Sequence, residues 1–380
     1  FQAEDGIRDE SLRLVGSEMC IRDRDSGNQG RLNMLLSSLA EHIYWFGRYI
    51  ERVESTARLI LVNDSLLLDI PPQCNTGWGP LVRITGSSEC FYRHHEEASE
   101  PNIIRFMVTD CENNPGSMLN SINHARENLR TCRALFPKPV WEAINNLHSH
   151  VNDNHGAALT GKQRYRFLRR TIDECHLIMG KLAVSMSHDD IYEFARMGFN
   201  LERADMTSRV IDVRSQHLLQ APGDELRPFE DIQWKSILDS LAAWQMYRRC
   251  ARIHINGRAV LGFLLLDRHF PRAINHCLLQ LEQSLYALAV NDAPRRALLE
   301  TQRQLKNTDI DTILGSRLHA YIDDLQLRFM AIHAELSSRY FDSSDISPMQ
   351  DESEAERTGA LQQYEKARGK PAALEESSSV

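Results

Sequence analysis

The spacing of apolar residues predicts helices along most of this chain. From Met34 onward, apolar side chains recur every three or four positions, which places them on one stripe of a long helix. The same spacing predicts further helices over 117–136, 138–151, 160–187 and 312–340. The alternation of apolar and polar residues that marks a half-buried strand is nearly absent. The pattern therefore predicts an all-α protein, folded as a helical bundle.

A fourteen-residue pattern occurs twice, as GRYIERVESTARLI at 47–60 and as GFNLERADMTSRVI at 198–211. The apolar stripe of the second copy matches that of the first, 151 positions earlier. A Trp, a Phe that precedes an Asp by four positions, and a Pro follow both copies in the same order. This order predicts an internal duplication, with pseudo-repeats over about 34–187 and 188–345. We expect the two halves to face each other across a pseudo-twofold axis.

Both ends of the chain depart from the helical pattern. Residues 1–33 are expected to be non-native or disordered, because 1–24 resembles translated sequencing-adapter sequence and lacks the apolar region of a signal peptide. Residues 346–380 are polar, charged and rich in small residues, which predicts a disordered tail. Within the remaining domain, 34–345, the segment 71–99 is rich in Gly, Ser and Pro and is expected to be the least ordered.

Composition excludes several classes of partner. The net charge of -8 argues against binding to nucleic acid. No apolar run approaches the length of a membrane span, so no membrane association is expected. The eight cysteines are irregularly spaced and form no C-x-x-C motif, which argues against a zinc site. Scattered thiols indicate a reducing compartment, and we expect a cytoplasmic protein.

The repeated polar residues are organised on the two predicted helices. At about 100° per residue, the acids and one arginine of each copy share a stripe beside the apolar one. Arg52 and Arg203 lie on the opposite flank. Arg126 and Arg130 lie on a basic face of the helix predicted over 117–136. These four arginines are candidates for a ligand or partner site together with the residues of the two stripes, which are Glu51, Glu54, Arg58, Glu202, Asp205 and Arg209.

Three interpretations fit these residues. Ion pairs would fix the register of the helices, which is the interpretation we favour. A di-metal carboxylate site would use the Glu-x-x-Glu and Glu-x-x-Asp spacings. However, an arginine lies one turn from each acid pair and both helices lack Glu-x-x-His, so no metal or other cofactor is expected. An anionic or peptide-like ligand would be bound by Arg52 and Arg203, with Glu51 and Glu202 fixing their orientation.

Several blocks of the sequence resemble one known family. MLLSSLAEHIYWFGRYIERVESTARLI, NPGSMLNSINHARENLRTCR and FNLERADMTSRVIDVR are similar to signature blocks of the bacterial Alpha-E family, a helical family with a Glu-Arg motif. The resemblance extends from about Met34 to Tyr340. It implies no established activity, because none is known for the family.

The resemblance also implies partners. Genes of the family tend to lie beside, or be fused with, genes for circularly permuted ATP-grasp proteins and transglutaminase-like proteins. We therefore expect an accessory or binding partner of an ATP-grasp-type ligase that makes or modifies a peptide or amide-linked compound. The alternative is an enzyme that acts on a peptide-like or aminoacyl substrate through the paired Glu-Arg motifs. The sequence leaves the substrate and the oligomeric state open.

Overall fold

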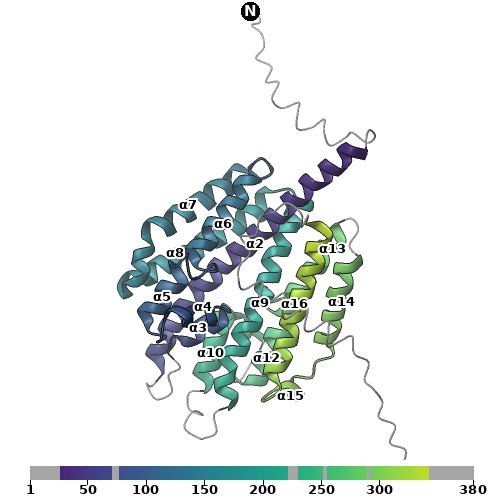
Figure 1. Cartoon of the computed structure of the whole chain (residues 1–380). Coiled ribbons are helices and arrows are strands. Elements are labelled where there is room, and N and C mark those ends of the chain that lie inside the picture. The colour runs from purple at the N-terminus through teal and green to yellow at the C-terminus, as the bar shows by residue number, and fades with distance from the viewer. Residues whose placement is uncertain (1–25, 71–76, 221–229, 251–254, 289–291, 342–380) are drawn as a thin grey trace, which may run out of the picture.

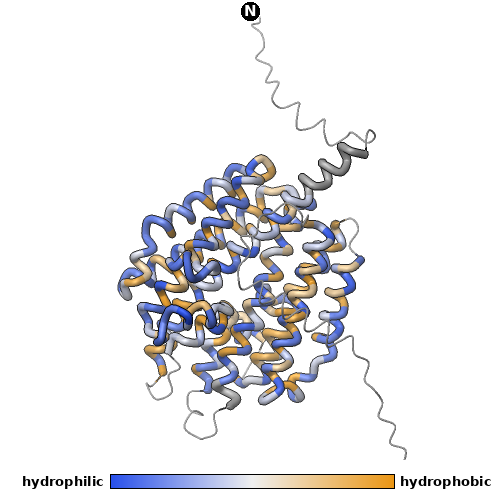
Figure 2. Tube along the Cα trace, in the orientation of Figure 1, coloured by the Kyte–Doolittle hydropathy of each residue, from blue (hydrophilic) through white to orange (hydrophobic). Residues whose placement is uncertain are grey.

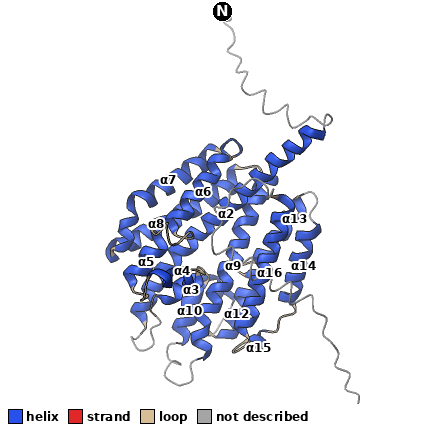
Figure 3. Ribbon diagram, viewed as in Figure 1, coloured by secondary structure: helices blue, strands red, loops and turns tan. Residues whose placement is uncertain are grey.

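The chain folds as a bundle of helices. A computed structural model describes residues 26–70, 77–220, 230–250, 255–288 and 292–341. Within these ranges the regular elements are helices, and no strand occurs there (Figure 3). The predicted all-α class is confirmed. Most of the predicted N-terminal segment, residues 1–25, and the predicted tail at 346–380 lie outside the described residues.

The first part of the chain is arranged around the long helix α2. Helices α6 and α8 pack on α2, and α7 packs on both of them (Figure 1). The short helices α3, α4 and α5 precede α6 in the chain. The elements are α2 (Ser26–Asp69), α3 (Gly79–Ile84), α4 (Ser88–His94), α5 (Glu100–Val108), α6 (Met118–Thr131), the 3-10 helix η4 (Arg133–Leu135), α7 (Lys138–Asn154), the 3-10 helix η5 (His155–Leu159) and α8 (Gly161–Ser185).

The second part is arranged around α9 in a corresponding way. Helices α13 and α16 pack on α9, and α14 packs on both of them (Figure 1). This repeats the relation of α6, α8 and α7 to α2. The elements are α9 (Asp190–Gln220), α10 (Glu230–Ser240), α11 (Trp244–Cys250), α12 (Gly257–Leu266), α13 (Ile274–Ala287), α14 (Asp292–Lys306), α15 (Ile310–Ile313) and α16 (Leu318–Tyr340).

The core lies where α2 meets α9. These two helices share the most extensive packing between elements of the described chain. Residues of the predicted apolar stripes belong to this core, and Figure 2 shows hydrophobic and hydrophilic residues alternating along the helices. The buried members of the two stripes are Ile43, Phe46, Ile50, Val53, Ala57, Ile60, Phe194, Met197, Leu201, Ala204, Ser208 and Ile211.

The predicted helix boundaries agree closely for α7 and α8, whereas the helix predicted over 117–136 ends at Thr131 and is followed by η4. Pro139 lies in the first turn of α7, where its missing N–H breaks no helical hydrogen bond. The last helix begins at Leu318 rather than at 312, because Gly315 adopts a φ of 98° and separates α15 from α16. The segment expected to be least ordered contains α3 and α4, which bury Leu81 and Phe91, and only its residues 71–76 lie outside the described part.

Asp189 caps α9, because its Oδ1 accepts hydrogen bonds from the N–H groups of Ile191 (3.1 Å) and Tyr192 (3.3 Å). No helix in the described ranges combines the length and the apolar character needed to cross a bilayer.

Candidate functional site

The two copies of the repeated pattern meet at a close helix crossing. A Cβ atom on Gly47 would lie well within 3.0 Å of the carbonyl oxygen of Ala195 on α9. A Cβ atom on Gly198 would lie closer still to the carbonyl oxygen of Tyr44 on α2. The two contacts are reciprocal, since Gly198 is 151 positions after Gly47 and Ala195 is 151 positions after Tyr44. Only glycine allows the two backbones to approach this closely.

The glutamate of each motif pairs with the arginine of the other motif. Arg52 Nε donates to Glu202 Oε1 at 2.7 Å, from α2 to α9. Arg203 Nε donates to Glu51 Oε1 at 3.1 Å and Arg203 Nη2 to Glu51 Oε2 at 2.6 Å, from α9 to α2. Glu51 is adjacent to Arg52 in the chain, and Glu202 is adjacent to Arg203. The pairs instead cross from one helix to the other, and so tie α2 to α9.

Two further arginines complete these pairs. Arg48 Nε donates to Glu202 Oε2 at 2.7 Å, and its guanidinium lies 5.0 Å from the ring centroid of Trp45. Arg272, from the loop before α13, contacts Glu51 through Nη1 and Glu54 through Nη2, the latter at 2.8 Å. Glu51 and Glu202 therefore each contact two guanidinium groups.

Glu54 is the centre of a second set of contacts. Its side chain is fully buried and contacts Arg272, Arg58 and His176. The Nε2 atom of His176 lies 3.0 Å from Glu54 Oε1. Burial lowers the pKa of His176, and the charges of Arg58 and Arg272 lower it further. The neutral imidazole of His176 can therefore donate a hydrogen bond to this carboxylate at pH 7.

The surrounding charges keep the motif carboxylates ionised. Burial alone would raise the pKa of Glu51, but the charges and hydrogen bonds of Arg203 and Arg272 lower it to about 2. Burial would likewise raise the pKa of Glu202, but Arg52 and Arg48 hold it well below its usual range. Both carboxylates are thus charged, fully paired and removed from water.

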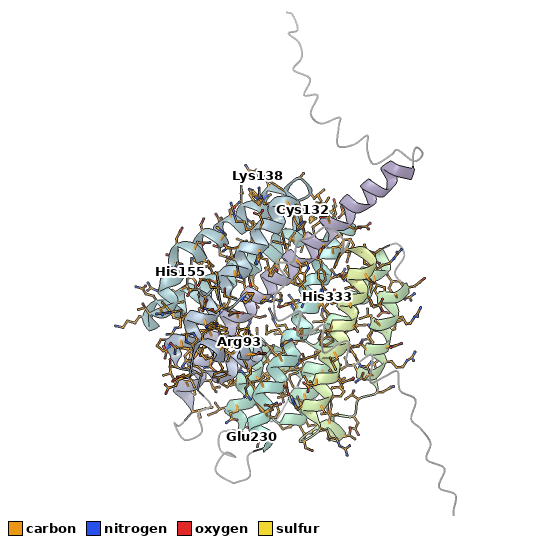
Figure 4. All side chains as sticks on the ribbon, in the orientation of Figure 1. Arg93, Cys132, Lys138, His155, Glu230 and His333 are labelled. Carbon is orange, nitrogen blue, oxygen red and sulfur yellow. The ribbon has the colours of Figure 1, made fainter. Side chains whose placement is uncertain are left out.

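A cleft opens beside one of the two cross-pairs. Arg52 and Thr56 of α2 line it, as do Glu202, Asp205 and Arg209 of α9. The loops before α4 and α6 close it with Thr85, Gly86, Ser87 and Gly116. Its empty volume is about 670 Å³, including open solvent at the mouth. Glu89 of α4 lies at the rim. It pairs at 2.5 Å with Arg93, which is labelled in Figure 4.

Most of the predicted site residues come together, and two do not. Asp205 and Arg209 pair within α9 at 3.0 Å and line the cleft, so the predicted spacing of four residues forms a contact. Arg126 donates instead to Asn145 Oδ1 on α7 at 2.8 Å. Arg130 pairs with Glu127 on the exposed face of α6. Neither Arg126 nor Arg130 contributes to the Glu-Arg cluster.

The site predicted from the sequence did not include Arg48, Arg272 and His176. Arg48 is not shared by the two copies, because Phe199 stands at the corresponding position of the second copy. Arg272 stands immediately before the start of α13, in a block whose counterpart before α6 has Gly116. The difference at that position was the signal that could have identified Arg272.

This geometry agrees with the register interpretation and opposes the metal interpretation. Glu51 and Glu54, which a di-metal site would need as ligands, are bridged by the guanidinium of Arg272. Removing one partner of such buried pairs costs several kcal/mol, which makes them effective in specifying which helices meet.

Comparison with known proteins places this chain in a family. Neither the curated proteins nor the solved structures contain a match. A family model matches residues 35–341 and is described as a predicted alpha-helical domain with a conserved ER motif. Within 35–341 the dipeptide Glu-Arg occurs at Glu51-Arg52 and Glu202-Arg203, whose cross-pairs join α2 and α9. Since the match covers most of its length, this chain belongs to the Alpha-E family, helical domains of unknown function.

Proposed function

We propose that this protein is a non-catalytic helical accessory protein and that its Glu-Arg motifs serve to fix the α2–α9 crossing. The observation that carries this proposal is the saturation of both motif glutamates. Glu51 and Glu202 each accept hydrogen bonds from two arginines, and their side chains are 0% and 3% exposed. Carboxylates held in this way stabilise a structure and have little capacity left for a substrate.

The chemistry of the pairs supports this role. A general base works best when its pKa lies near the working pH. The pKa of Glu51 is about 2, and that of Glu202 is also far below its usual range. Both groups are therefore weak bases at neutral pH. Their arginine partners are engaged as well, so the motifs are poorly suited to proton transfer.

The partner that we propose is an ATP-grasp-type ligase that makes or modifies a peptide or amide-linked compound. Support for this partner comes from the resemblance of the sequence blocks to the Alpha-E family, whose genes lie near those of circularly permuted ATP-grasp proteins and transglutaminase-like proteins. A preformed helical surface, held by the buried ion pairs, would give such a partner a rigid docking platform.

Association and activity of the purified pair test this proposal. The full chain is mixed with the ATP-grasp protein encoded nearest to it, and complex formation and ATP turnover are measured. We expect a stable complex, altered ATP turnover, or both. If the two proteins neither associate nor change each other's ATP turnover, the accessory role is refuted.

The enzymatic alternative has one feature in its favour, the cleft. Arg52, Asp205 and Arg209 line it, and a substrate could reach them there. The substitutions Glu51→Gln and Glu202→Gln separate the two functions. Under the accessory role they lower the melting temperature, and the ligase effect declines in proportion. An enzyme would lose more activity than the loss of stability explains.

A further inference from the structure

A second cluster of polar side chains lies between α9 and α16, which pack on each other (Figure 1). Asp212 of α9 and His319 and Asp323 of α16 each present an atom that can bind a metal, and these three atoms lie within 4.8 Å of one another. No other group of three His, Cys, Asp or Glu side chains in the described ranges is spaced in this way. The cluster shares no residue with the Glu-Arg motifs, and the proposed accessory role does not use it.

Each of the two helices supplies a pair of side chains one turn apart. Asp212 and Gln216 are four residues apart on α9, and His319 and Asp323 are four residues apart on α16, so each pair shares one face of its helix. His319 Nδ1 lies 2.8 Å from Asp212 Oδ1 and 3.2 Å from Gln216 Nε2. Its other ring nitrogen, Nε2, lies 3.4 Å from Asp323 Oδ2. Helical bundles build metal sites from side chains on facing helices in this way.

The carboxylate of Asp212 is buried and has a partner on one oxygen. The residue is 8% exposed, and its hydrogen bond within the described chain joins Oδ1 to His319. No described residue donates a hydrogen bond to Oδ2. Burial raises the pKa of Asp212, although His319 acts against this, whereas two arginines each lower the pKa of Glu51 and Glu202. A buried charge is costly unless it is paired and hydrogen-bonded, so Asp212 favours a further cation beside it.

The ring nitrogen that faces Asp212 has two partners that it cannot satisfy together. Nδ1 of His319 carries either a proton or a lone pair. With a proton it donates to Asp212 but meets the N–H group of Gln216, and with a lone pair it accepts from Gln216 but meets a carboxylate oxygen. A metal ion between these groups binds the lone pair and the carboxylate together. A half-turn of the Gln216 amide then brings its oxygen to the ion, at the expense of a 3.4 Å contact with Arg83.

The charges around the cluster admit a divalent cation. The charged groups that act on Asp212 and His319 are Asp323 and Arg83 of α3. The guanidinium of Arg83 reaches the amide oxygen of Gln216 rather than the carboxylate of Asp212. The imidazole is neutral when it binds a metal. Two negative charges therefore face one positive charge, and the site without an ion is negative.

We propose that Asp212, Gln216 and His319 bind a Zn²⁺ ion, through a carboxylate oxygen, the amide oxygen and Nδ1. Zn²⁺ binds imidazole and carboxylate at about 2.0–2.2 Å, which places neighbouring ligand atoms about 3.0–3.4 Å apart. The distances of 2.8 and 3.2 Å from Nδ1 are close to this spacing. Asp323 accepts from Nε2–H and holds the ring, as carboxylates do for metal-binding histidines. The side chains of His319 and Asp323 are 54% and 52% exposed, so water can take the remaining position.

A zinc titration of the metal-free full chain tests this proposal. Zinc is added in competition with a chromophoric chelator, and the native chain is compared with His319→Ala. The matched control is His269→Ala, which removes an exposed histidine outside the cluster. We expect the native chain and the control to bind one more equivalent of zinc than His319→Ala. Mg²⁺ should not compete, because it prefers oxygen ligands to imidazole. Equal zinc stoichiometry in the native chain and folded His319→Ala would overturn the proposal.

Thermal unfolding and a second variant make the test independent of the folding of His319→Ala. Asp212→Asn keeps the shape of the side chain and removes its charge, so we expect zinc to bind at least about tenfold more weakly to this site. Zinc at a hundred times its Kd should raise the melting temperature of the native chain and of His269→Ala by at least about 2 °C. Asp212→Asn should show a smaller rise at the same zinc concentration. Unchanged zinc affinity in Asp212→Asn, or no effect of zinc on the native melting temperature, would contradict the assignment.

Discussion

Replacing Glu51 by glutamine tests the structural role of the Glu-Arg motif. The substitution keeps the size and shape of the side chain and removes its charge. Arg203 and Arg272 would then remain in a buried site without the carboxylate that both contact. We therefore expect Glu51→Gln to fold and to be markedly less stable than the native protein.

The magnitude follows from the burial and the pKa of Glu51. Removing one partner of a buried ion pair costs about 3–5 kcal/mol. The lowering of the Glu51 pKa from 4.5 to about 2 independently corresponds to about 3 kcal/mol. The side chain is fully buried, so solvent screening does not reduce this figure. The amide oxygen of glutamine still accepts one hydrogen bond, which places the expected loss near the lower end, about 3 kcal/mol.

Urea unfolding followed by circular dichroism measures this loss, with Glu127→Gln as the matched control. Glu127 also pairs with an arginine, Arg130, but on the exposed face of α6. Exposed pairs contribute little to stability, so the control should unfold at the native urea concentration. A Glu51→Gln midpoint that coincides with that of the control would refute the view that the buried pairs hold the two helices together.

Three other properties follow from the same structure. The free energy of unfolding should fall as the pH decreases from about 5 to 2, because Glu51 binds a proton in the unfolded chain but stays ionised in the folded one. This dependence of stability on pH should be weaker in Glu51→Gln, and acid titrations of both proteins will measure it. Gly198→Ala should lower the melting temperature, because its Cβ atom would collide with α2, whereas Gly180→Ala, which meets no atom within 4 Å inside α8, should raise it slightly. A thiol reagent should modify the exposed Cys250 quickly, and modify Cys277 only on unfolding, because burial raises the pKa of that thiol to about 12.

The helical period allowed most of the fold to be predicted. The stripe from Ile43 to Ile60 is buried as expected, since one face of a helix at this spacing must turn toward the core. The segment 71–99 was harder to interpret, because its polar composition conceals a few well-placed apolar residues. Leu81 and Phe91 are each fully buried and organise α3 and α4.

The candidate site was only partly predictable. The acids and arginines were identifiable because they recur in both copies, but their pairing depends on which helix faces which. Glu51 and Arg52 are neighbours in the chain and serve different partners, Arg203 and Glu202. The internal duplication remains a prediction from the sequence, and the reciprocal glycine contacts of α2 and α9 are the geometry that it leads one to expect.

The cross-pairing of the two motifs is tested most directly by two double-mutant cycles. The first combines Glu202→Gln with Arg52→Gln, whose side chains meet at 2.7 Å between α9 and α2. The second combines Glu202→Gln with Arg203→Gln, which is adjacent in the chain but pairs with Glu51. We predict a coupling free energy of about 1–3 kcal/mol in the first cycle and less than about 0.5 kcal/mol in the second. A first coupling near zero, or a second coupling as large as the first, would contradict the account.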